Sequence, residues 1–307
     1  MSADHIGIMD IQFNTNCYRF MPFQNSNEYS RMNEKNVDDS PGLLDQIVDC
    51  TYIIHLEGND RLPHIYAELA KTKPTKTIFI VFNPGFKKCE KKLIDQASYQ
   101  DLTDAFLQCF KHARDNKYKN ILILEDDFIF NPEIHSGAHI DCICRFLETR
   151  KNEEYVYHIG LIPVIAYPVD WTTYRSIKSF TMHSAIYSEK CIENSANYSF
   201  DYKHWDVIIE KNVKNRYFYN KPLCYQTFPL TENRKTWENK DVTFFWKWVK
   251  NFAINQLVLN EYPEPGFSIL YWVSKLLCFI LLLCFIYVLY LFSKNLYRIT
   301  LSTSRKK

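Results

Sequence analysis

The sequence predicts an α/β fold, a mostly parallel sheet flanked by helices, with one transmembrane helix near the C-terminus. Three patterns carry this prediction. Short apolar runs alternate with helical spacing between residues 50 and 130, as in strand–helix–strand units. One of these runs leads directly into three carboxylates, and a long apolar stretch follows near residue 267.

The first half of the chain has the clearest elements. Strands are expected at 50–56, 77–82 and 121–130, with helices at 62–73 and 99–118 between them, because turn residues separate the apolar runs. Beyond residue 131 the pattern is less regular. The segments expected there are helices at 140–149 and 202–213, and strands at 155–166, 179–187 and 222–228.

The third strand of this series ends in Glu125, Asp126 and Asp127. Burying an unpaired charge costs several kcal/mol, so these acids should lie at the carboxyl edge of the sheet, where open α/β sheets bind ligands. Carboxylates gathered there can hold Mg²⁺ or Mn²⁺, with phosphate oxygens completing the coordination. A solvated acidic turn is the alternative interpretation.

Composition excludes several classes of function. The chain of 307 residues has only 7 glycines, and it contains neither G-x-G-x-x-G nor a P-loop pattern. Its net charge is +2, but six basic residues follow position 267, which leaves 31 basic against 35 acidic residues before it. A mildly acidic domain argues against nucleic acid as a partner. The ten cysteines are scattered, which favours mostly reduced thiols.

Residues 267–292 are apolar apart from Lys275, and a bilayer-spanning helix needs about 20 such residues. Tyr271, Trp272 and Tyr290 suit the aromatic belts of a membrane protein. A buried core helix is the alternative. The expected organisation has four parts, which are an irregular lead-in at 1–48, a folded domain at 49–262, a transmembrane helix at 267–292 and a basic tail at 293–307.

The sequence does not decide on which side of the membrane the folded domain lies, although it favours an endomembrane. Positive charge in the tail would keep the tail cytoplasmic and place the domain in the lumen, yet residues 1–20 contain no signal-peptide pattern. A tail-anchored protein with a cytoplasmic domain is the other possibility. The sequon Asn197-Tyr-Ser199 matters only for a lumenal domain.

Several motifs together resemble glycosyltransferase family 25, which includes lipooligosaccharide and collagen galactosyltransferases. The first strand Tyr52-Ile-Ile-His-Leu56 is followed by Asp60-Arg61, Leu122-Ile-Leu-Glu-Asp-Asp127 matches the family's acidic strand, and Thr181 to Lys190 is similar to a later strand and short helix. The resemblance covers roughly residues 50 to 230. The chain departs from the family at His55, where an asparagine is usual, and at Ser98-Tyr99, where the family has Ser-His.

The resemblance implies a GT-A-like fold and an inverting transfer of galactose or glucose from a nucleotide-diphosphate sugar, such as a UDP-hexose, to a glycan or protein hydroxyl. It implies that Asp127, with Asp126 or Glu125, holds Mn²⁺ or Mg²⁺. Arg61 and His183 would contact the donor. The alternative interpretation is that Arg61 is a surface arginine and His183 a histidine packed in the core.

Inversion requires a general base, and the acids of residues 200–210 are candidates. Asp206 and Glu210 are four residues apart, so they share a helix face. Asp206 is the preferred base, and Trp205 beside it could stack on a sugar. Acids that stabilise a helix N-terminus are the alternative.

Two other functions stay open. A degenerate transferase fold could serve as a non-catalytic membrane scaffold, and a metal-dependent phosphoesterase would need acids from several strand ends. A zinc site is a weaker alternative. Its ligands would come from four residues close in sequence, His135, His139, Cys142 and Cys144.

Overall fold

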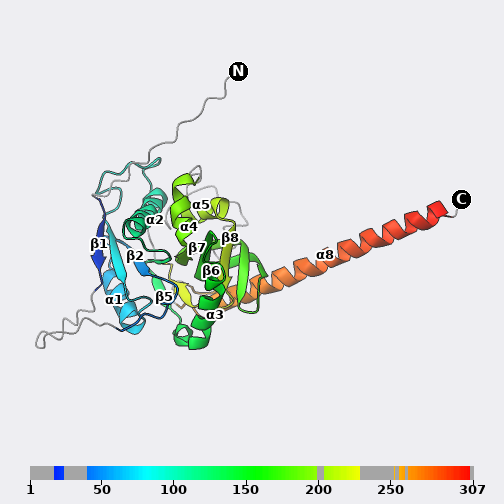
Figure 1. Cartoon of the computed structure of the whole chain (residues 1–307), viewed down its shortest axis with the longest axis horizontal. Coiled ribbons are helices and arrows are strands. Elements are labelled where there is room, and N and C mark those ends of the chain that lie inside the picture. The colour runs from blue at the N-terminus through cyan, green and yellow to red at the C-terminus, as the bar shows by residue number, and fades with distance from the viewer. Residues whose placement is uncertain are drawn as a thin grey trace, which may run out of the picture.

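The computed structural model describes residues 17–23, 40–198, 204–228, 252, 256–259 and 262–304. Figure 1 shows an α/β domain from which the long helix α8 (Gly266–Ser304) projects as a rod. The predicted fold class is thus confirmed at the level of a mixed α/β domain with one long apolar C-terminal helix.

The domain is built on a seven-stranded sheet, in the order β1-β3-β2-β4-β7-β6-β8. The central strands β3, β2 and β4 are parallel, as predicted. Strands β1 and β7 run antiparallel to their neighbours, which makes the sheet mixed. The seven strands are β1 (Arg19–Pro22), β2 (Cys50–Leu56), β3 (Ile78–Asn83), β4 (Ile121–Glu125), β6 (Tyr155–Pro168), β7 (Thr173–Tyr187) and β8 (Asn215–Tyr219).

A second, two-stranded sheet and several helices complete the domain. The small sheet pairs β5 with β9 in antiparallel fashion. The remaining elements are β5 (Phe128–Phe130), β9 (Cys224–Gln226), α1 (Leu62–Lys71), α2 (Ser98–Asp115), α3 (Gly137–Glu148), α4 (Glu189–Asn194), α5 (Trp205–Asn212) and the short 3-10 turns η2 (Pro132–His135) and η3 (Ser195–Asn197).

Alternate residues of the central strands face two separate hydrophobic cores. Ile53 of β2 packs in the core that contains Ile65 of α1. Its neighbour Tyr52 packs in the other core, with Phe106 and Phe110 of α2. Side chains of a strand point alternately to the two faces of a sheet, so α1 and α2 cover opposite faces. Full burial of each such side chain contributes about 1.5–3 kcal/mol.

The chain reverses its direction of travel across the sheet at β2. It passes from β2 through α1 to β3 on one side, and then through α2 to β4 on the other side of β2. The carboxyl ends of β2 and β4 therefore flank a topological switch point, which is where open α/β sheets bind ligands.

The expectation of an irregular lead-in at 1–48 is wrong where the structure describes that segment. Strand β1 pairs with β3 at the edge of the sheet, and Leu44 is fully buried. Cys17 also forms a disulfide with Cys89, with 5.9 Å between their Cα atoms. The other eight cysteines are free. The expectation of mostly reduced thiols therefore holds for these eight, and one pair is oxidised.

Helix α8 begins where the transmembrane helix was predicted, but it does not end there. It continues to Ser304 through most of the expected basic tail. The stretch Gly266–Asn295 is long and apolar enough to cross a membrane. Phe267, Tyr271 and Ser274 in its first turns are buried against the domain, so one face of the start of the predicted 267–292 span packs on protein.

Gly160 in β6 occupies a position with no room for a side chain. A Cβ atom there would overlap the carbonyl group of Cys224 and the ring of His183. We expect Gly160→Ala to destabilise the domain by about 1–3 kcal/mol, because overpacking shifts the backbone. Thermal unfolding measures this, with Gly137→Ala as the control, since a Cβ at Gly137 meets no atom within 4 Å. Equal unfolding temperatures for the two variants would contradict this account.

Candidate functional site

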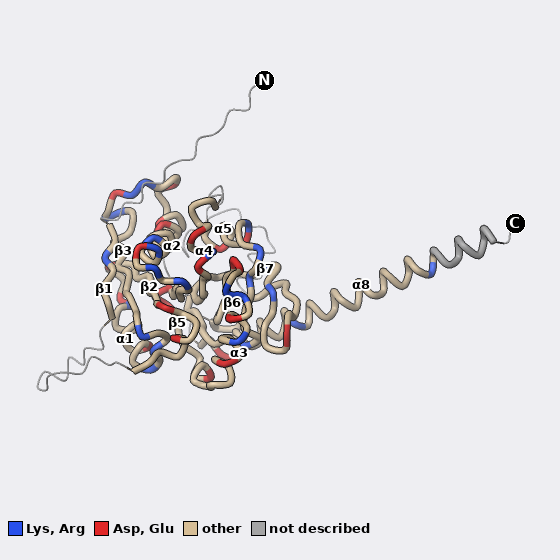
Figure 2. The backbone as a smooth tube through the Cα atoms, in the orientation of Figure 1, with Lys and Arg blue, Asp and Glu red and all other residues tan. Residues whose placement is uncertain are grey.

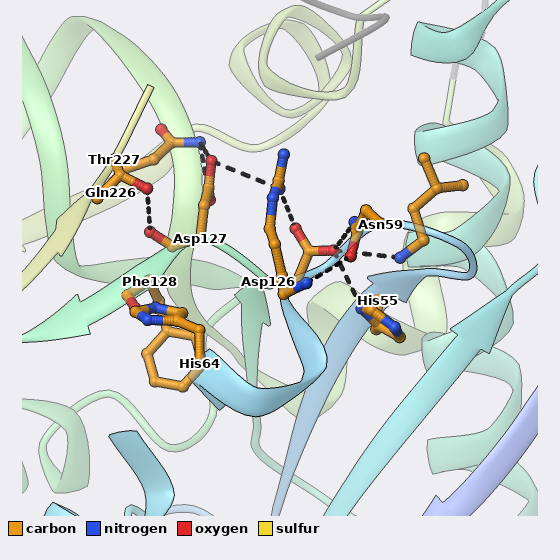
Figure 3. A network of polar contacts seen from close by, with 10 residues as sticks. His55, Asn59, His64, Asp126, Asp127, Phe128, Gln226 and Thr227 are labelled. Atoms are coloured by element: carbon orange, nitrogen blue, oxygen red, sulfur yellow. Dashed lines mark hydrogen bonds and ion pairs between the residues drawn. The ribbon is translucent and has the colours of Figure 1, made fainter. Parts of the chain in front are cut away.

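The three predicted acids lie at the carboxyl edge of the sheet, in the turn between β4 and β5. Glu125 ends β4 and is half-buried. Asp126 and Asp127 are each only 6% exposed. Figure 3 shows His55 and Asn59 directed at Asp126, and Gln226 directed at Asp127. Asp126 and Asp127 are therefore enclosed by polar partners rather than solvated, which excludes a solvated turn at these two residues.

Asp126 is held by four donors. Its Oδ2 accepts hydrogen bonds from Asn59 Nδ2 at 2.7 Å, from the backbone N–H of Leu56 at 3.2 Å and from His55 Nδ1 at 3.3 Å. Its Oδ1 forms an ion pair with Arg61. Burial alone would raise the pKa of Asp126, but the hydrogen bonds from His55 and Asn59 and the charge of Arg61 outweigh it and lower this pKa. Asp126 is thus a stable anion that fixes the loop after β2.

Arg61 lies between the two aspartates. Its Nη1 pairs with Asp126 and is 4.0 Å from Asp127 Oδ2. Asn59 positions it locally, because the Asn59 side-chain oxygen accepts the Arg61 backbone N–H at 3.1 Å, directly before α1. Within the described part of the chain, Nε and Nη2 of Arg61 make no hydrogen bond, and the side chain is 21% exposed. Two donors of the guanidinium thus remain available to an anion.

Asp127 has weaker partners than Asp126. Gln226 Nε2 lies 3.3 Å from each of its carboxylate oxygens, and its backbone oxygen accepts the N–H of Thr227 at 3.0 Å. Burial and the charge of Asp126 raise the pKa of Asp127 to about 7, against the opposing effects of Arg61 and Gln226. The negative charge of Asp127 is therefore only partly compensated at neutral pH.

Glu125 adds to this excess of negative charge. Burial raises the pKa of Glu125 well above its usual value, and the charges of Asp127, Asp126 and Asp206 raise it further. No hydrogen bond reaches its carboxylate from the described residues. Among those residues, no group of three or more His, Cys, Asp or Glu side chains is placed to hold a metal ion. A cation here would thus need further oxygens, such as those of a bound phosphate.

The two candidate bases lie on α5 but have different surroundings. Asp206 is half-buried, and its Oδ1 accepts the backbone N–H of Val207 at 2.9 Å. Burial raises the pKa of Asp206 despite the nearby charges of His204 and Lys178. Glu210 forms an ion pair with Lys178 at 2.7 Å. The structure therefore brings Asp206 into electrostatic contact with Glu125, whereas Glu210 is neutralised.

Trp205 does not face the site. It is 3% exposed, stacks on Phe106 at 5.0 Å and donates its indole N–H to the Tyr187 hydroxyl at 3.0 Å. The expectation that Trp205 stacks on a sugar is wrong, because a tryptophan that completes the core beneath α5 is inaccessible to a substrate.

His183 is also part of the core. It is fully buried, with Nδ1 3.1 Å from the Thr181 hydroxyl and Nε2 3.2 Å from the Cys224 carbonyl oxygen. Burial lowers the pKa of His183 to about 4, so the ring is neutral and donates to one of these oxygens. Both ring nitrogens bind partners inside the domain. His183 is therefore not available to contact a nucleotide-sugar substrate.

The four residues of the alternative zinc site have separate partners. His135 Nε2 lies 3.0 Å from the Thr72 hydroxyl, and His139 Nδ1 lies 2.9 Å from the Tyr219 hydroxyl. Cys144 is buried in the core, and Cys142 packs against it from outside. These contacts account for the four side chains without a metal.

Three site residues could not be found from the sequence motifs alone. His55 stands in the sequence only as a departure from a family pattern, and Asn59 lies among the turn residues after the first strand. Each could have been suspected, because a polar residue inside an apolar strand or a tight turn needs a partner. Gln226 gave no signal, since its contact joins residues 99 positions apart.

Comparisons with known proteins add little. No protein-family model matches the chain, and no curated protein matches it. Among solved structures, the chain is similar to "Crystal Structure of A197 from STIV", with a TM-score of 0.38 and 12% identity over 60% of this chain and 86% of the other. A similarity this low carries no argument about function.

Proposed function

We propose that this protein is a membrane-anchored glycosyltransferase that moves a hexose, galactose or glucose, from a nucleotide-diphosphate sugar to a glycan or protein hydroxyl. One observation carries the proposal. Asp127, an acid with incomplete charge compensation, lies 4.0 Å from an arginine that keeps two donors for an anion. Both lie at the topological switch point of an α/β sheet, which favours a ligand that combines a cation with a diphosphate.

The proposed cation is Mn²⁺ or Mg²⁺, with oxygens of the bound diphosphate completing a coordination that the described side chains do not supply by themselves. We propose Asp127 and Glu125 as the protein ligands, because their raised pKa values reflect a charge that a cation would balance. Asp126 was also predicted as a ligand, but its four donors make it the residue that positions Arg61. A divalent cation bound here would neutralise charge on the departing diphosphate.

Arg61 and Asp206 have separate roles in this proposal. Arg61 would bind a phosphate of the donor through Nε and Nη2, since a guanidinium binds phosphate in bidentate geometry. Asp206 would take the proton of the acceptor hydroxyl. Its raised pKa brings its basicity closer to that needed near neutral pH. We propose that the sheet corresponds to a GT-A-like arrangement, with which these roles would accord.

The decisive experiment is an assay of the detergent-purified full chain against a panel of sugar nucleotides, with and without Mn²⁺. We expect metal-dependent release of nucleoside diphosphate from a UDP-hexose, and faster release when a suitable acceptor is added. Binding without release at any metal concentration would support the non-catalytic scaffold instead. The proposal would be overturned if the protein neither bound nor cleaved any sugar nucleotide of the panel.

We further propose that α8 anchors the domain on the oxidising side of an endomembrane. The disulfide between Cys17 and Cys89 supports this side, because disulfides are rare in reducing compartments. The basic residues after α8's apolar stretch also favour it, since positive flanking segments stay in the cytoplasm. These residues are Lys294, Arg298, Arg305, Lys306 and Lys307.

This orientation predicts two changes in gel mobility. Protein from isolated membranes should migrate differently with and without reductant, and Cys89→Ser should abolish the difference. The exposed Asn197 should carry a glycan that an endoglycosidase removes, and Asn197→Gln should lack this shift. Reduction of the disulfide should also lower stability by about 2–4 kcal/mol. A fully reduced, unglycosylated protein whose domain is cleaved by protease added to sealed microsomes would place the domain in the cytoplasm.

A further inference from the structure

The turn between β6 and β7 presents a fully exposed tryptophan. Trp171 is 96% exposed, and Val169 and Tyr167 beside it are 38% and 40% exposed. The turn itself is well ordered. Asp170 Oδ1 accepts the backbone N–H groups of Thr172 and Thr173, each at 2.7 Å. The protein therefore holds a large apolar side chain in solvent on a rigid support.

This turn is tied to the start of α8 by a chain of hydrogen bonds. Asn220 Nδ2 donates to the Trp171 carbonyl at 3.0 Å, and Lys275 Nζ of α8 donates to the Asn220 carbonyl at 2.7 Å. Lys275 also lies over the ring of Trp272, which is 70% exposed. The backbone of Trp171 is thus linked to Lys275 of α8 through a single residue, Asn220.

The length of α8 fixes where the bilayer must begin. One face of the helix packs against the domain up to Ser274, and the next charged residue after Lys275 is Lys294. Figure 2 shows this uncharged stretch between the two lysines. Residues 276–293 number 18 and span about 27 Å. A hydrocarbon core is about 30 Å thick, so it takes up the whole stretch and reaches the surface of the domain.

From this geometry we infer that the β6–β7 turn is a second membrane contact, in which Trp171 inserts into the lipid interface beside α8. Tryptophan prefers this interface because its ring is amphipathic. Helix α8 packs along β6 where it leaves the domain (Figure 1), and the turn follows β6 directly, so we expect one membrane plane to meet both the helix and the turn. Two contacts would fix the tilt of the domain on the bilayer. The inference rests on membrane insertion of α8 and is independent of the proposed catalysis.

Tryptophan fluorescence of the full chain in phosphatidylcholine liposomes tests this. The emission of wild type minus that of Trp171→Phe isolates Trp171, and the same difference for Trp272→Phe reports on α8. We expect brominated acyl chains to quench both difference signals, and liposomes to protect both from iodide. The Trp171→Phe substitution should leave release of nucleoside diphosphate unchanged, since Trp171 is outside the candidate site.

The two signals separate the possible failures. Quenching of Trp272 by brominated lipid, together with iodide access to Trp171 and no lipid effect on it, would overturn the inference while α8 stays in the membrane. No lipid effect on either residue would overturn the membrane anchor and the inference with it. Either result would leave the metal-dependent release assay unaffected.

Discussion

Replacing Asp127 with asparagine is expected to lower metal-dependent release of nucleoside diphosphate by about 10²–10³-fold. The substitution keeps the shape of the side chain and its contact with Gln226 but removes the charge that would hold the cation. Loss of one preorganised electrostatic contact to the reacting group has an effect of about this size in enzymes. The measurement is the initial rate of release as a function of Mn²⁺ concentration.

Two further variants make this result specific. Asp141→Asn removes an exposed acid on α3 and should leave the rate unchanged. Asp126→Asn removes the charge that pairs with Arg61, so Arg61 should bind the phosphate of the sugar nucleotide less well. The KM of this variant should therefore rise more than its kcat falls. Unchanged release by Asp127→Asn, with unfolding like that of the wild type, would show that the site is assigned to the wrong residues.

Periodicity predicted the centre of the fold well. The predicted strands at 50–56 and 77–82 became β2 and β3, and the predicted strand at 121–130 is divided into β4 and into β5 of the second sheet. Strands β2, β3 and β4 are parallel, and the two helices between them cover opposite faces. These elements are long and strongly patterned, so their local sequence is enough to define them. The position of the acids followed from the same reasoning, because charges cannot end a buried strand inside its core.

Long-range contacts account for what the sequence did not predict. Strand β1 is a four-residue edge strand whose pattern is exposed on most positions, and only its pairing with β3 makes it a strand. Strand β8 is paired with both β6 and β7, and its residues carry no alternation that distinguishes them from a loop. Trp205 looked like a sugar platform because an aromatic beside an acid has no local sign of burial. Helix α5 packing on α2 decides its role.

The three acids of the site differ in how well the fold stabilises their ionised forms. Asp126 is stabilised by four donors, and its pKa is lowered, so this residue holds the β2–α1 loop rigid. Asp127 and Glu125, its neighbours on the chain, have raised pKa values and are disfavoured as anions. Strain of this kind is typical of functional sites, where a ligand supplies the missing charge.

The metal-free protein is therefore expected to lose stability as pH rises. The pKa of Asp127 is near 3.9 in an unfolded chain and about 7 in the fold, so folding favours the protonated form. The stabilising contribution is complete below pH 4 and is lost as pH rises through 7. The total is roughly 4 kcal/mol, at about 1.4 kcal/mol per unit. Thermal unfolding in detergent with a chelator, between pH 5 and 8, measures the decline.

Asp127→Asn should reverse this penalty, because the amide cannot ionise. At pH 8 without metal, the variant should be more stable than the wild type by up to about 4 kcal/mol, although its release of nucleoside diphosphate is expected to be much slower. Saturating Mn²⁺ should stabilise the wild type by about 2.7 kcal/mol at 100 times its Kd and should leave the variant unchanged. Asp141→Asn should behave as the wild type does. A variant less stable than the wild type at pH 8 would mean that Asp127 is a structural anion like Asp126, and the cation site would have no basis. Gain of stability with loss of activity in one substitution would show that Asp127 serves function at a cost in stability.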